Sequence, residues 1–456
     1  MTKGFSVPQW ALIFLLALAA NQALSAACNP ALQSCAPSAD FGGNTGDSSE
    51  GGQTCKPSAG GSTCGGAGVA SQGNSSGTEQ GAGNPINIIN GNKFQIEVDM
   101  PALPGVLGLE LVRYYNSQYS LPNEPVGILG HGWKLSYETR LRNTAVGLQI
   151  VQADGTRLIF QKNAADRSRC VTQNPANGVI HIQETPLGKE YLWRWPGNGS
   201  AGGRELMFNE GGRLVQIKAP TGEFVSLRYS PQGVLQQVRD PQGRILQLNY
   251  LDHTSPQLGS DGLQKFRGLQ SVDSPVGRFI FQFGSPMPKD SKLLQEMTAA
   301  NLTQVAIPTW YDADQRAHAF SNVGVSRSDI ARIYHYENPR FPTLMTGISV
   351  QGAGSDGVVM HQRISTYGYD NWGKAIMSEK ADGVEKLSLD TSKPGQTVLT
   401  NALGQTTHYK FADIAGHWRL LESRGAGCAQ CGPPNMRYGY DKLGRLTEQT
   451  QLNAQG

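Results

Sequence analysis

The chain has 456 residues, of which 38% are hydrophobic and 16% are charged, and its formal net charge is +3 at pH 7. The charges are spread along the chain without a basic run, which argues against a nucleic-acid partner. The 56 glycines and the modest charge are typical of a turn-dense extracellular β protein, and the length is ample for a hydrophobic core.

Residues 1–27 are predicted to be a secretory signal peptide. Lys3 precedes an apolar run from Trp10 to Ala20 that is too short for a comfortable membrane span, and small residues surround Ala26. We expect cleavage close to Cys28, which places the mature protein in the cell envelope or outside the cell. An uncleaved N-terminal anchor and a lipoprotein with lipid on Cys28 are the alternatives.

Residues 28–83 are predicted to be a flexible linker. They are rich in Gly, Ser, Asn and Thr, and such a segment cannot bury enough apolar surface to offset its ordering entropy. Four cysteines in it would be oxidisable after export, and their pairing stays open among three combinations: Cys28, Cys35, Cys55 and Cys64. A metal site is not expected here, since no histidine precedes His131.

Residues 84–165 are predicted to form a β domain. Its motifs are Arg113-Tyr114-Tyr115-Asn116-Ser117 and the turn Gly130-His131-Gly132-Trp133, with Tyr137 four residues later. His131 is expected to be structural because it lies inside a tight turn. Trp133 and Tyr137 suggest either core packing or a stacked sugar, and core packing is the preferred interpretation.

Residues 166–456 carry an internal repeat. Four turns of one kind end at near-equal intervals, at Gly212, Gly222, Gly233 and Gly243. Three of them have proline in second place, where φ must be roughly −65°. Short β-rich segments lie between the turns, and aromatic residues recur at a step of 21, at Phe208, Tyr229 and Tyr250. We therefore predict consecutive antiparallel hairpins over residues 205–283, with a further turn at Gly277.

Two later motifs share one pattern, Tyr369-Asp370-Asn371-Trp372-Gly373 and Tyr440-Asp441-Lys442-Leu443-Gly444-Arg445-Leu446. This pattern resembles the signature of the bacterial RHS, or YD, repeat. The residues that carry it are Tyr369, Asp370, Gly373, Tyr440, Asp441, Gly444, Arg445 and Leu446. The Arg-x-Tyr-Asn-Ser and Gly-x-Gly-Trp motifs of residues 84–165 likewise resemble the domain that often precedes RHS repeats.

The resemblance implies a mostly β fold, in which consecutive antiparallel hairpins of RHS/YD type form a curled sheet, or partial shell, with few helices. Residues 292–300 are the best helix candidate. In the RHS family such a shell commonly encloses a C-terminal toxin domain or presents a surface at the cell envelope. The leading hypothesis is thus a non-enzymatic secreted or cell-surface protein, the shell-building N-terminal portion of a polymorphic-toxin-like system without its own toxin domain. The alternative is an envelope module that binds carbohydrate or another cell's surface.

Motifs for catalysis, metal binding or cofactor binding are not found in the sequence. The closest candidate is Cys428-Ala429-Gln430-Cys431, which we interpret as a structural disulfide in an exported protein, with free thiols or a metal as alternatives. No role is assigned to Cys170.

The repeat region is expected to be incomplete at its C-terminal side. Tyr440 to Gln451 begins a hairpin whose outer strand has no later strand to pair with. An open sheet edge is a template for another chain, so we expect self-association or pairing with a C-terminal RHS continuation or a toxin partner.

Overall fold

The computed structural model describes residues 81–82, 86–120, 126–145, 147–155, 157–172, 177–195, 203–250, 268–284, 300–306, 331–353, 359–414, 417–426, 434–442 and 446–453. The predicted signal peptide lies outside these residues. So do the predicted linker, apart from residues 81–82, and the predicted helix, apart from Ala300.

One long antiparallel sheet runs in chain order from β6 to β29, and each strand pairs with the next. Its strands are β6 (Arg140–Thr144), β7 (Gly147–Val151), β8 (Arg157–Lys162), β9 (Arg169–Val171), β10 (Val179–Thr185), β11 (Gly188–Arg194), β12 (Glu205–Phe208), β13 (Leu214–Lys218), β14 (Phe224–Tyr229), β15 (Leu235–Arg239), β16 (Ile245–Tyr250), β17 (Leu269–Ser274), β18 (Gly277–Gly284), β19 (Asn301–Ala306), β20 (Ala331–His335), β21 (Gly347–Ala353), β22 (Val359–Tyr369), β23 (Ala375–Lys380), β24 (Leu387–Asp390), β25 (Gln396–Thr400), β26 (Thr406–Ile414), β27 (His417–Gly425), β28 (Met436–Tyr440) and β29 (Leu446–Gln451).

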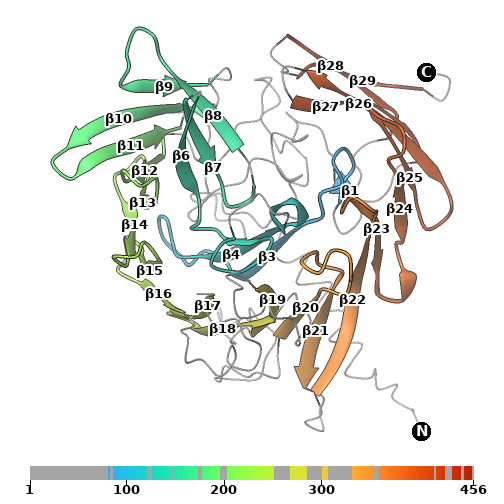
Figure 1. Ribbon diagram of the computed structural model, residues 1–456, viewed down its shortest axis with the longest axis horizontal. Coiled ribbons are helices and arrows are strands. Elements are labelled where there is room, and N and C mark those ends of the chain that lie inside the picture. Colours follow the sequence, from blue (N-terminus) through green and yellow to red (C-terminus); the bar gives the residue numbers. More distant parts are fainter. Residues whose placement is uncertain are drawn as a thin grey trace, which may run out of the picture.

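The long sheet curls without closing on itself. Figure 1 shows it as an open ring, with β6–β9 at one end and β28–β29 at the other. Within the described ranges, α-helices do not occur, and the helical turns are the 3-10 segments η4 (Ser117–Ser120) and η7 (Ala381–Gly383). The predicted fold class, a mostly β protein built as a curled sheet of consecutive hairpins, is confirmed.

The N-terminal strands lie inside the curl. A second sheet of β3 (Phe94–Met100), β4 (Leu111–Asn116) and β5 (Trp133–Leu135) sits on the concave side of the long sheet (Figure 1). A short pair, β1 (Gly81–Ala82) and β2 (Ile86–Asn87), precedes it. The predicted 84–165 segment therefore contributes both to the inserted sheet and, through β6–β8, to the start of the long sheet, where β8 pairs with β9 across residue 165.

The hairpin turns share one hydrogen-bonding scheme. In the turn from Asp240 to Arg244, the Gly243 N–H donates to the Asp240 carbonyl (3.0 Å), and the Asp240 N–H donates to the Arg244 carbonyl (3.1 Å). Gly243 has a φ of +84°, which identifies a type I turn followed by a G1 bulge. The same scheme at Gly212, Gly222 and Gly233, and the tight turn at Gly277, confirm the hairpins predicted over residues 205–283.

The recurring aromatic residues mark β-bulges. Tyr229 pairs with Leu235, whereas its neighbour Arg228 pairs with Gln237, so β15 carries one extra residue at this point. Equivalent shifts of register occur at Phe208, Tyr250, Phe283, Tyr369 and Tyr440. A bulge bends its strand and increases the local twist, so regularly spaced bulges contribute to the curl of the sheet.

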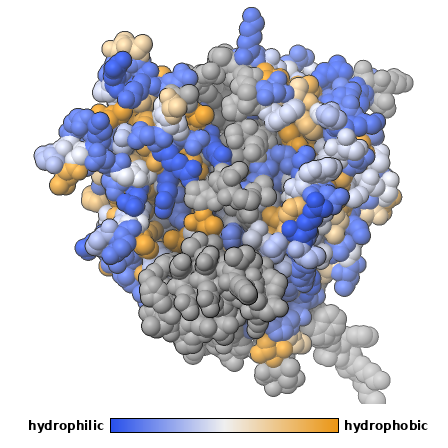
Figure 2. Space-filling view, viewed as in Figure 1, coloured by the Kyte–Doolittle hydropathy of each residue, from blue (hydrophilic) through white to orange (hydrophobic). Residues whose placement is uncertain are grey.

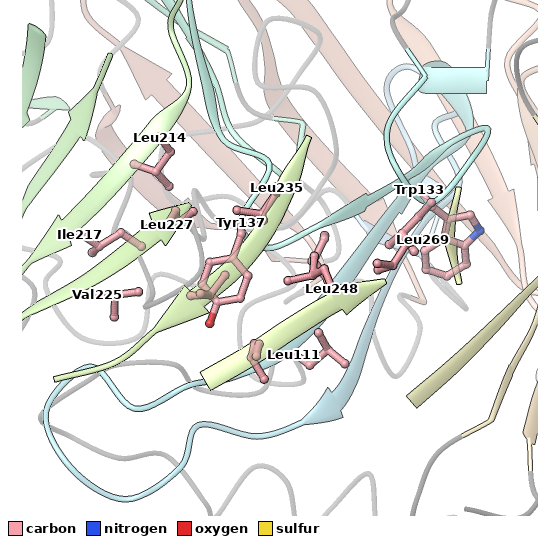
Figure 3. Packing of buried hydrophobic residues seen from close by; sticks show 14 of the residues in the cluster. Leu111, Trp133, Tyr137, Leu214, Ile217, Val225, Leu227, Leu235, Leu248 and Leu269 are labelled. Carbon is pink, nitrogen blue, oxygen red and sulfur yellow. The ribbon is translucent and has the colours of Figure 1, made fainter. Parts of the chain in front are cut away.

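The concave face of the long sheet is apolar. Side chains alternate along each strand, so Val225 and Leu227 of β14 point inward while Phe224 is exposed. Figure 3 shows Leu111 and Tyr137 of the N-terminal segment packed near leucines of β13–β17. Each large apolar side chain buried in this way contributes about 1.5–3 kcal/mol of transfer free energy.

A second core lies under the C-terminal strands. Its members from the long sheet are Ala375, Leu387, Leu389, Leu399, Tyr409, Leu420, Met436 and Tyr438. The residues that cover them from the concave side are Ile86, Ile88 and Ile89. The N-terminal segment thus covers apolar surface in both halves of the curl.

The first strand of the long sheet folds back on a later hairpin. Arg140 of β6 bridges Arg213 at the start of β13, and the Leu141 N–H donates to the Gly212 carbonyl (2.9 Å). Strands β6–β13 therefore form a roll at this end of the molecule, which we call the N-terminal roll.

The outward surface is predominantly polar. On the face seen in Figure 2, hydrophilic residues occupy much of the coloured surface, and apolar residues are scattered between them. The most exposed large apolar side chains lie at hairpin turns, at Leu187, Trp372 and Leu403. Such isolated residues are ordinary on a protein surface.

Candidate functional site

The signature residues Tyr369, Asp370 and Gly373 form one turn of the scaffold. The Tyr369 hydroxyl donates to the Met345 carbonyl (2.6 Å), and burial raises the pKa of Tyr369 well above its usual value. One Asp370 carboxylate oxygen accepts from the N–H groups of Trp372 (2.8 Å) and Lys374 (2.9 Å). Gly373 has a φ of +81°, which only glycine adopts at low cost.

The second signature motif is described in part. The Tyr440 hydroxyl donates to the Leu420 carbonyl (2.8 Å), and Leu446 packs against the C-terminal core. Gly444 and Arg445 lie outside the described residues, and Asp441 lies within them.

The same tyrosine contact occurs elsewhere in the repeat. Tyr229 donates to the carbonyl of Leu214 (2.7 Å), and Tyr250 donates to that of Leu235 (2.5 Å). Tyr229 and Tyr250 thus reach the first residue of the preceding strand, whereas Tyr440 reaches Leu420 within β27 and Tyr369 reaches Met345 just before β21. The signature tyrosines therefore connect neighbouring segments of the sheet through hydrogen bonds, and their geometry indicates a structural role.

The Arg-x-Tyr-Asn-Ser strand packs against the long sheet through a buried charge network. Arg113 pairs with Asp99, both side chains are fully buried, and Arg113 also donates to the Tyr334 hydroxyl (2.8 Å). Next to them, Arg332 of β20 pairs with Glu97 of β3. Burial disfavours the charge of Arg113, but Asp99 and Tyr334 raise its pKa overall.

Aromatic side chains surround this charge network. Trp133 lies between Tyr115 and Tyr334, with ring centroids 5.2 and 4.8 Å away, and the Arg113 guanidinium lies 4.8 Å from the Trp133 ring. The Trp133 indole N–H donates to the Tyr336 hydroxyl (3.0 Å). Trp133 and Tyr137 are each 1% exposed, so their predicted role in the core is confirmed.

The turn before Trp133 contacts the residue that precedes β19 through its backbone. The His131 N–H donates to the Ala300 carbonyl (2.9 Å), and a side chain at Gly130 would collide with that same oxygen. Burial lowers the pKa of His131. These contacts agree with the structural role predicted for this turn.

The predicted disulfide lies outside the part of the chain that the structure describes. Cys428 and Cys431 lie outside the described residues, as do Cys28, Cys35, Cys55 and Cys64. Cys170 of β9 is a buried free thiol in the core of the N-terminal roll, and burial raises its pKa. A buried thiol with a raised pKa is a weak nucleophile.

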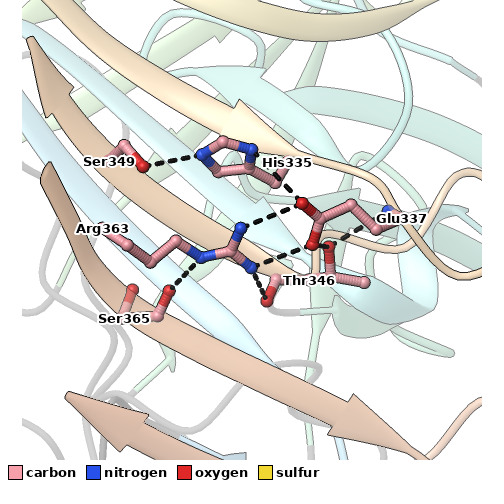
Figure 4. A network of polar contacts seen from close by, with 6 residues as sticks. All are labelled: His335, Glu337, Thr346, Ser349, Arg363 and Ser365. Atoms are coloured by element: carbon pink, nitrogen blue, oxygen red, sulfur yellow. Dashed lines mark hydrogen bonds and ion pairs between the residues drawn. The ribbon is translucent and has the colours of Figure 1, made fainter. Parts of the chain in front are cut away.

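A polar network on β20–β22 has the residue types of a hydrolase triad (Figure 4). The Nε2 of His335 lies 2.7 Å from the Ser349 hydroxyl oxygen, and its Nδ1 lies 3.6 Å from a Glu337 carboxylate oxygen. A histidine between a serine and a carboxylate can activate the serine for nucleophilic attack. This set could not be predicted from the sequence, because His335 and Ser349 lie 14 positions apart in no recognisable motif.

The surroundings of this network favour a structural role. Ser349 is only 4% exposed, and Arg363 donates to both carboxylate oxygens of Glu337 (3.0 Å each). The Thr346 hydroxyl donates a third hydrogen bond to Glu337 (3.0 Å). Burial and the Arg363 charge lower the pKa of His335, which weakens it as a base. The network therefore ties β20, β21 and β22 together.

Among the described residues, His, Cys, Asp and Glu side chains do not gather into a group of three or more that could hold a metal ion. Within those residues, no helix is both long and apolar enough to span a membrane.

Comparison with known proteins gives one sequence-family match. The family described as "Domain of unknown function (DUF6531)" matches residues 83–160, close to the predicted 84–165 segment. No curated protein matches the sequence.

Among solved structures, the chain is similar to crystal structures titled TcdB2-TccC3-Cdc42 (12% identity, TM-score 0.33), TcdB2-TccC3 (13%, 0.30) and TcdB2-TccC3-TEV (11%, 0.26). The matches cover 79, 83 and 67% of this chain. The chain spans only 21, 23 and 17% of the length of those chains, and scores this low support no statement about function.

Proposed function

We propose that this chain is a non-enzymatic shell protein of the RHS type, the N-terminal shell-building portion of a polymorphic-toxin-like system. The observation that carries the proposal is the single sheet from β6 to β29, which curls around the inserted strands β3–β5. Its turns include the Tyr369-Asp370 motif that resembles the YD repeat.

The physical basis is the apolar concave face. One hairpin cannot bury its apolar side alone, so each depends on its neighbours and on the strands inside the curl. A curved wall with a polar outside and an apolar inside is suited to surrounding another polypeptide segment. The charges and hydrogen bonds described above serve to hold this wall together.

The proposal includes export to the cell envelope or the medium, which rests on the apolar N-terminal segment from Trp10 to Ala20. Mass spectrometry of the protein from a Gram-negative host should show a mature chain that begins between Ala26 and Cys28. An intact Met1 in the envelope fraction would contradict cleavage. A diacylglyceryl group on Cys28 would replace the secreted form with a lipoprotein.

The partner is proposed to join at the outer edge of β29. Among the described strands, the register places β29 beside β28 alone and the long sheet is not closed, which leaves the other edge of β29 available to a further strand. A continuation of the repeats or a toxin-bearing chain could extend the sheet there.

The test is co-expression of the full chain with the polypeptide encoded immediately downstream. We expect the two to co-purify, and we expect the downstream polypeptide to become resistant to added protease. The double variant Leu446→Pro, Thr447→Pro should abolish both effects, because it disrupts the edge strand. Lys442→Pro is the matched control, since proline occupies the equivalent turn position at Pro231 and Pro241. Separate elution and unchanged protease sensitivity would contradict the shell role.

A further inference from the structure

A cleft of about 490 Å³ lies at the mouth of the N-terminal roll. Its volume is within the range of small-molecule sites. Its floor is apolar and consists of Leu148, Ile182 and Tyr191, of which Leu148 and Tyr191 are buried. Ile182 and Tyr191 are directly paired neighbours on β10 and β11, so this floor is fixed by the sheet.

Charged side chains begin where this floor ends. Lys162 follows Phe160 on the inward face of β8, and Glu184 follows Ile182 on that of β10. Because side chains alternate with a period of two, each charged residue continues the inward row of its strand. The cleft therefore has an apolar base and a charged rim.

One wall of the cleft is a hydrogen-bonded loop between β8 and β9. The Asn163 amide oxygen accepts from the Ala165 N–H (2.8 Å), and the Asp166 carboxylate accepts from the Ser168 N–H (3.0 Å) and hydroxyl (2.6 Å). The Ile182 N–H of β10 donates to the Ser168 carbonyl (2.7 Å). These bonds hold Arg167 and Ser168 at the rim.

The rim carries an unbalanced set of charges. Lys162, Arg167 and Lys189 face Glu184 and Glu210, which leaves one net positive charge. Lys189 lies 3.5 Å from Glu184, so those two partly satisfy each other. Lys162 and Arg167 make no ion pair with any described residue.

We propose that this cleft binds a sugar that carries a single carboxylate, of the uronic-acid class. The Arg167 guanidinium and the Lys162 ammonium would hold the carboxylate, since a guanidinium fork matches carboxylate geometry. Glu184 and Glu210 would accept hydrogen bonds from ring hydroxyls, and the apolar floor would contact the C–H face of the ring.

The same charges discriminate against other ligands. Glu184 and Glu210 repel a second anionic group, which disfavours polyanions such as nucleic acids. A neutral sugar would leave the two cations unused. Sugar binding at this strand-end cleft does not depend on the proposed shell role.

The test is titration of the full chain with glucuronic acid, glucose, glucosamine and sodium sulfate, with binding measured by calorimetry or ligand-observed NMR. We expect saturable binding of glucuronic acid that is about tenfold or more tighter than that of glucose, glucosamine or sulfate. The affinity should fall as salt is raised from roughly 0.05 to 0.5 M, because the rim is exposed to solvent.

Variants locate the binding. Lys162→Ala, Arg167→Ala should weaken glucuronic acid binding by about tenfold or more. Arg228→Ala, Lys393→Ala removes the same charge at exposed positions outside the cleft and should leave binding unchanged. Equal thermal unfolding of both variants would show that each is folded.

Three results would overturn the proposal. The first is an equal loss of affinity for glucuronic acid in both double variants. The second is an affinity for glucose or sulfate equal to that for glucuronic acid, and the third is no saturation by glucuronic acid up to roughly 10 mM. None of these results bears on co-purification with a downstream partner, so the two proposals fail independently.

Discussion

The Tyr250 hydroxyl bonds the carbonyl of Leu235, and Leu235 is the residue that pairs with Tyr229 one repeat earlier. Each aromatic residue of the repeat is thus linked to the previous one through a leucine. The linkage explains why tyrosine recurs at these positions: the ring fills the core and the hydroxyl satisfies a carbonyl beside a bulge.

Removing the tyrosine hydroxyl should destabilise the sheet without leaving a cavity in the core. We expect Tyr250→Phe to lower the free energy of unfolding by about 0.5–1.5 kcal/mol, the usual net value of one hydrogen bond. Urea unfolding midpoints measure the effect. Tyr191→Phe is the control, because no hydrogen bond of that hydroxyl is described. Equal midpoints for both variants would show that the hydroxyl contact adds no stability.

Two glycines in equivalent turns should respond differently to alanine. Gly222 has a φ of +104° and open space where a Cβ would lie, so Gly222→Ala should cost only the strain of a positive φ, about 1–2 kcal/mol. A Cβ on Gly212 would lie 1.9 Å from the Leu141 carbonyl oxygen. Gly212→Ala should therefore cost more, about 3 kcal/mol or above, and should release β6 from β13. Protease cleavage within residues 140–144 should rise only in Gly212→Ala.

Breaking the buried Arg113–Asp99 pair should be strongly destabilising. Arg113→Met leaves the Asp99 carboxylate buried with only Arg332 nearby, at 3.9 Å, and should cost about 3–5 kcal/mol. The double variant Arg113→Met, Asp99→Leu should recover much of this loss, because the uncompensated charge is gone. Arg278→Met removes an exposed partner of Asp273 and should have little effect. A double variant as unstable as the single one would argue against the charge explanation.

Lys134 should make stability depend on pH between about 8 and 10.5. Burial lowers the pKa of Lys134 to about 8, with Glu138 raising it and Arg142 and Arg140 lowering it. Between the folded and unfolded pKa values the unfolded chain holds the extra proton, so stability rises with pH across this window. Below pH 8 the folded protein bears the full cost of burying the charge.

Lys134→Met should remove that rise, and it should be more stable than the wild type at pH 7. Unfolding midpoints of both proteins at a series of pH values give the difference in stability between them. Tyrosine ionisation at high pH affects both proteins equally, so it does not contribute to this difference. Parallel curves for the two proteins would contradict the assignment to Lys134.

Glu422 should have the opposite pH behaviour at the acid end. Its carboxylate accepts hydrogen bonds from Arg424 (2.8 Å), Lys410 (3.3 Å) and Arg437. The hydrogen bond from Arg424 is the largest of several causes that together lower the pKa of Glu422 to about 2. The stability from this carboxylate is full above about pH 4.5 and is lost as the pH falls towards 2. Glu422→Gln should lose stability at neutral pH and show a smaller acid dependence. Glu448→Gln, at an exposed position, should behave as the wild type does.

Local chain signals accounted for the hairpins. The turns at Gly222, Gly233 and Gly243 predicted consecutive hairpins within residues 205–283, and β14 and β16 are two of the strands between those turns. Proline, glycine and small polar residues determine the backbone conformation of a turn within five residues, so these turns can be predicted from the local sequence. The prediction of the curl came from the family resemblance and is physically explained by the bulges.

Contacts between distant segments could not be predicted in this way. Arg113 donates a hydrogen bond to Tyr334, which lies 221 positions later in the chain, and the sequence around either residue does not indicate this contact. The Ser349–His335 contact and the cleft at Lys162 likewise depend on strand register and on how β6–β13 roll up. Register is set by the whole sheet, which explains why these features appeared only in three dimensions.

The insertion of the N-terminal strands into the curl has a consequence for the order of folding during synthesis. Hairpins such as β13–β14 need only neighbouring residues and can form early in folding. The Ile88 carbonyl, however, accepts its hydrogen bond from the Thr397 hydroxyl (2.6 Å), which is 309 residues later in the chain. The segment with Ile86, Ile88 and Ile89 therefore stays uncovered until the strands around Thr397 have been made and have folded onto it. During that interval these three isoleucines are the natural target for a chaperone.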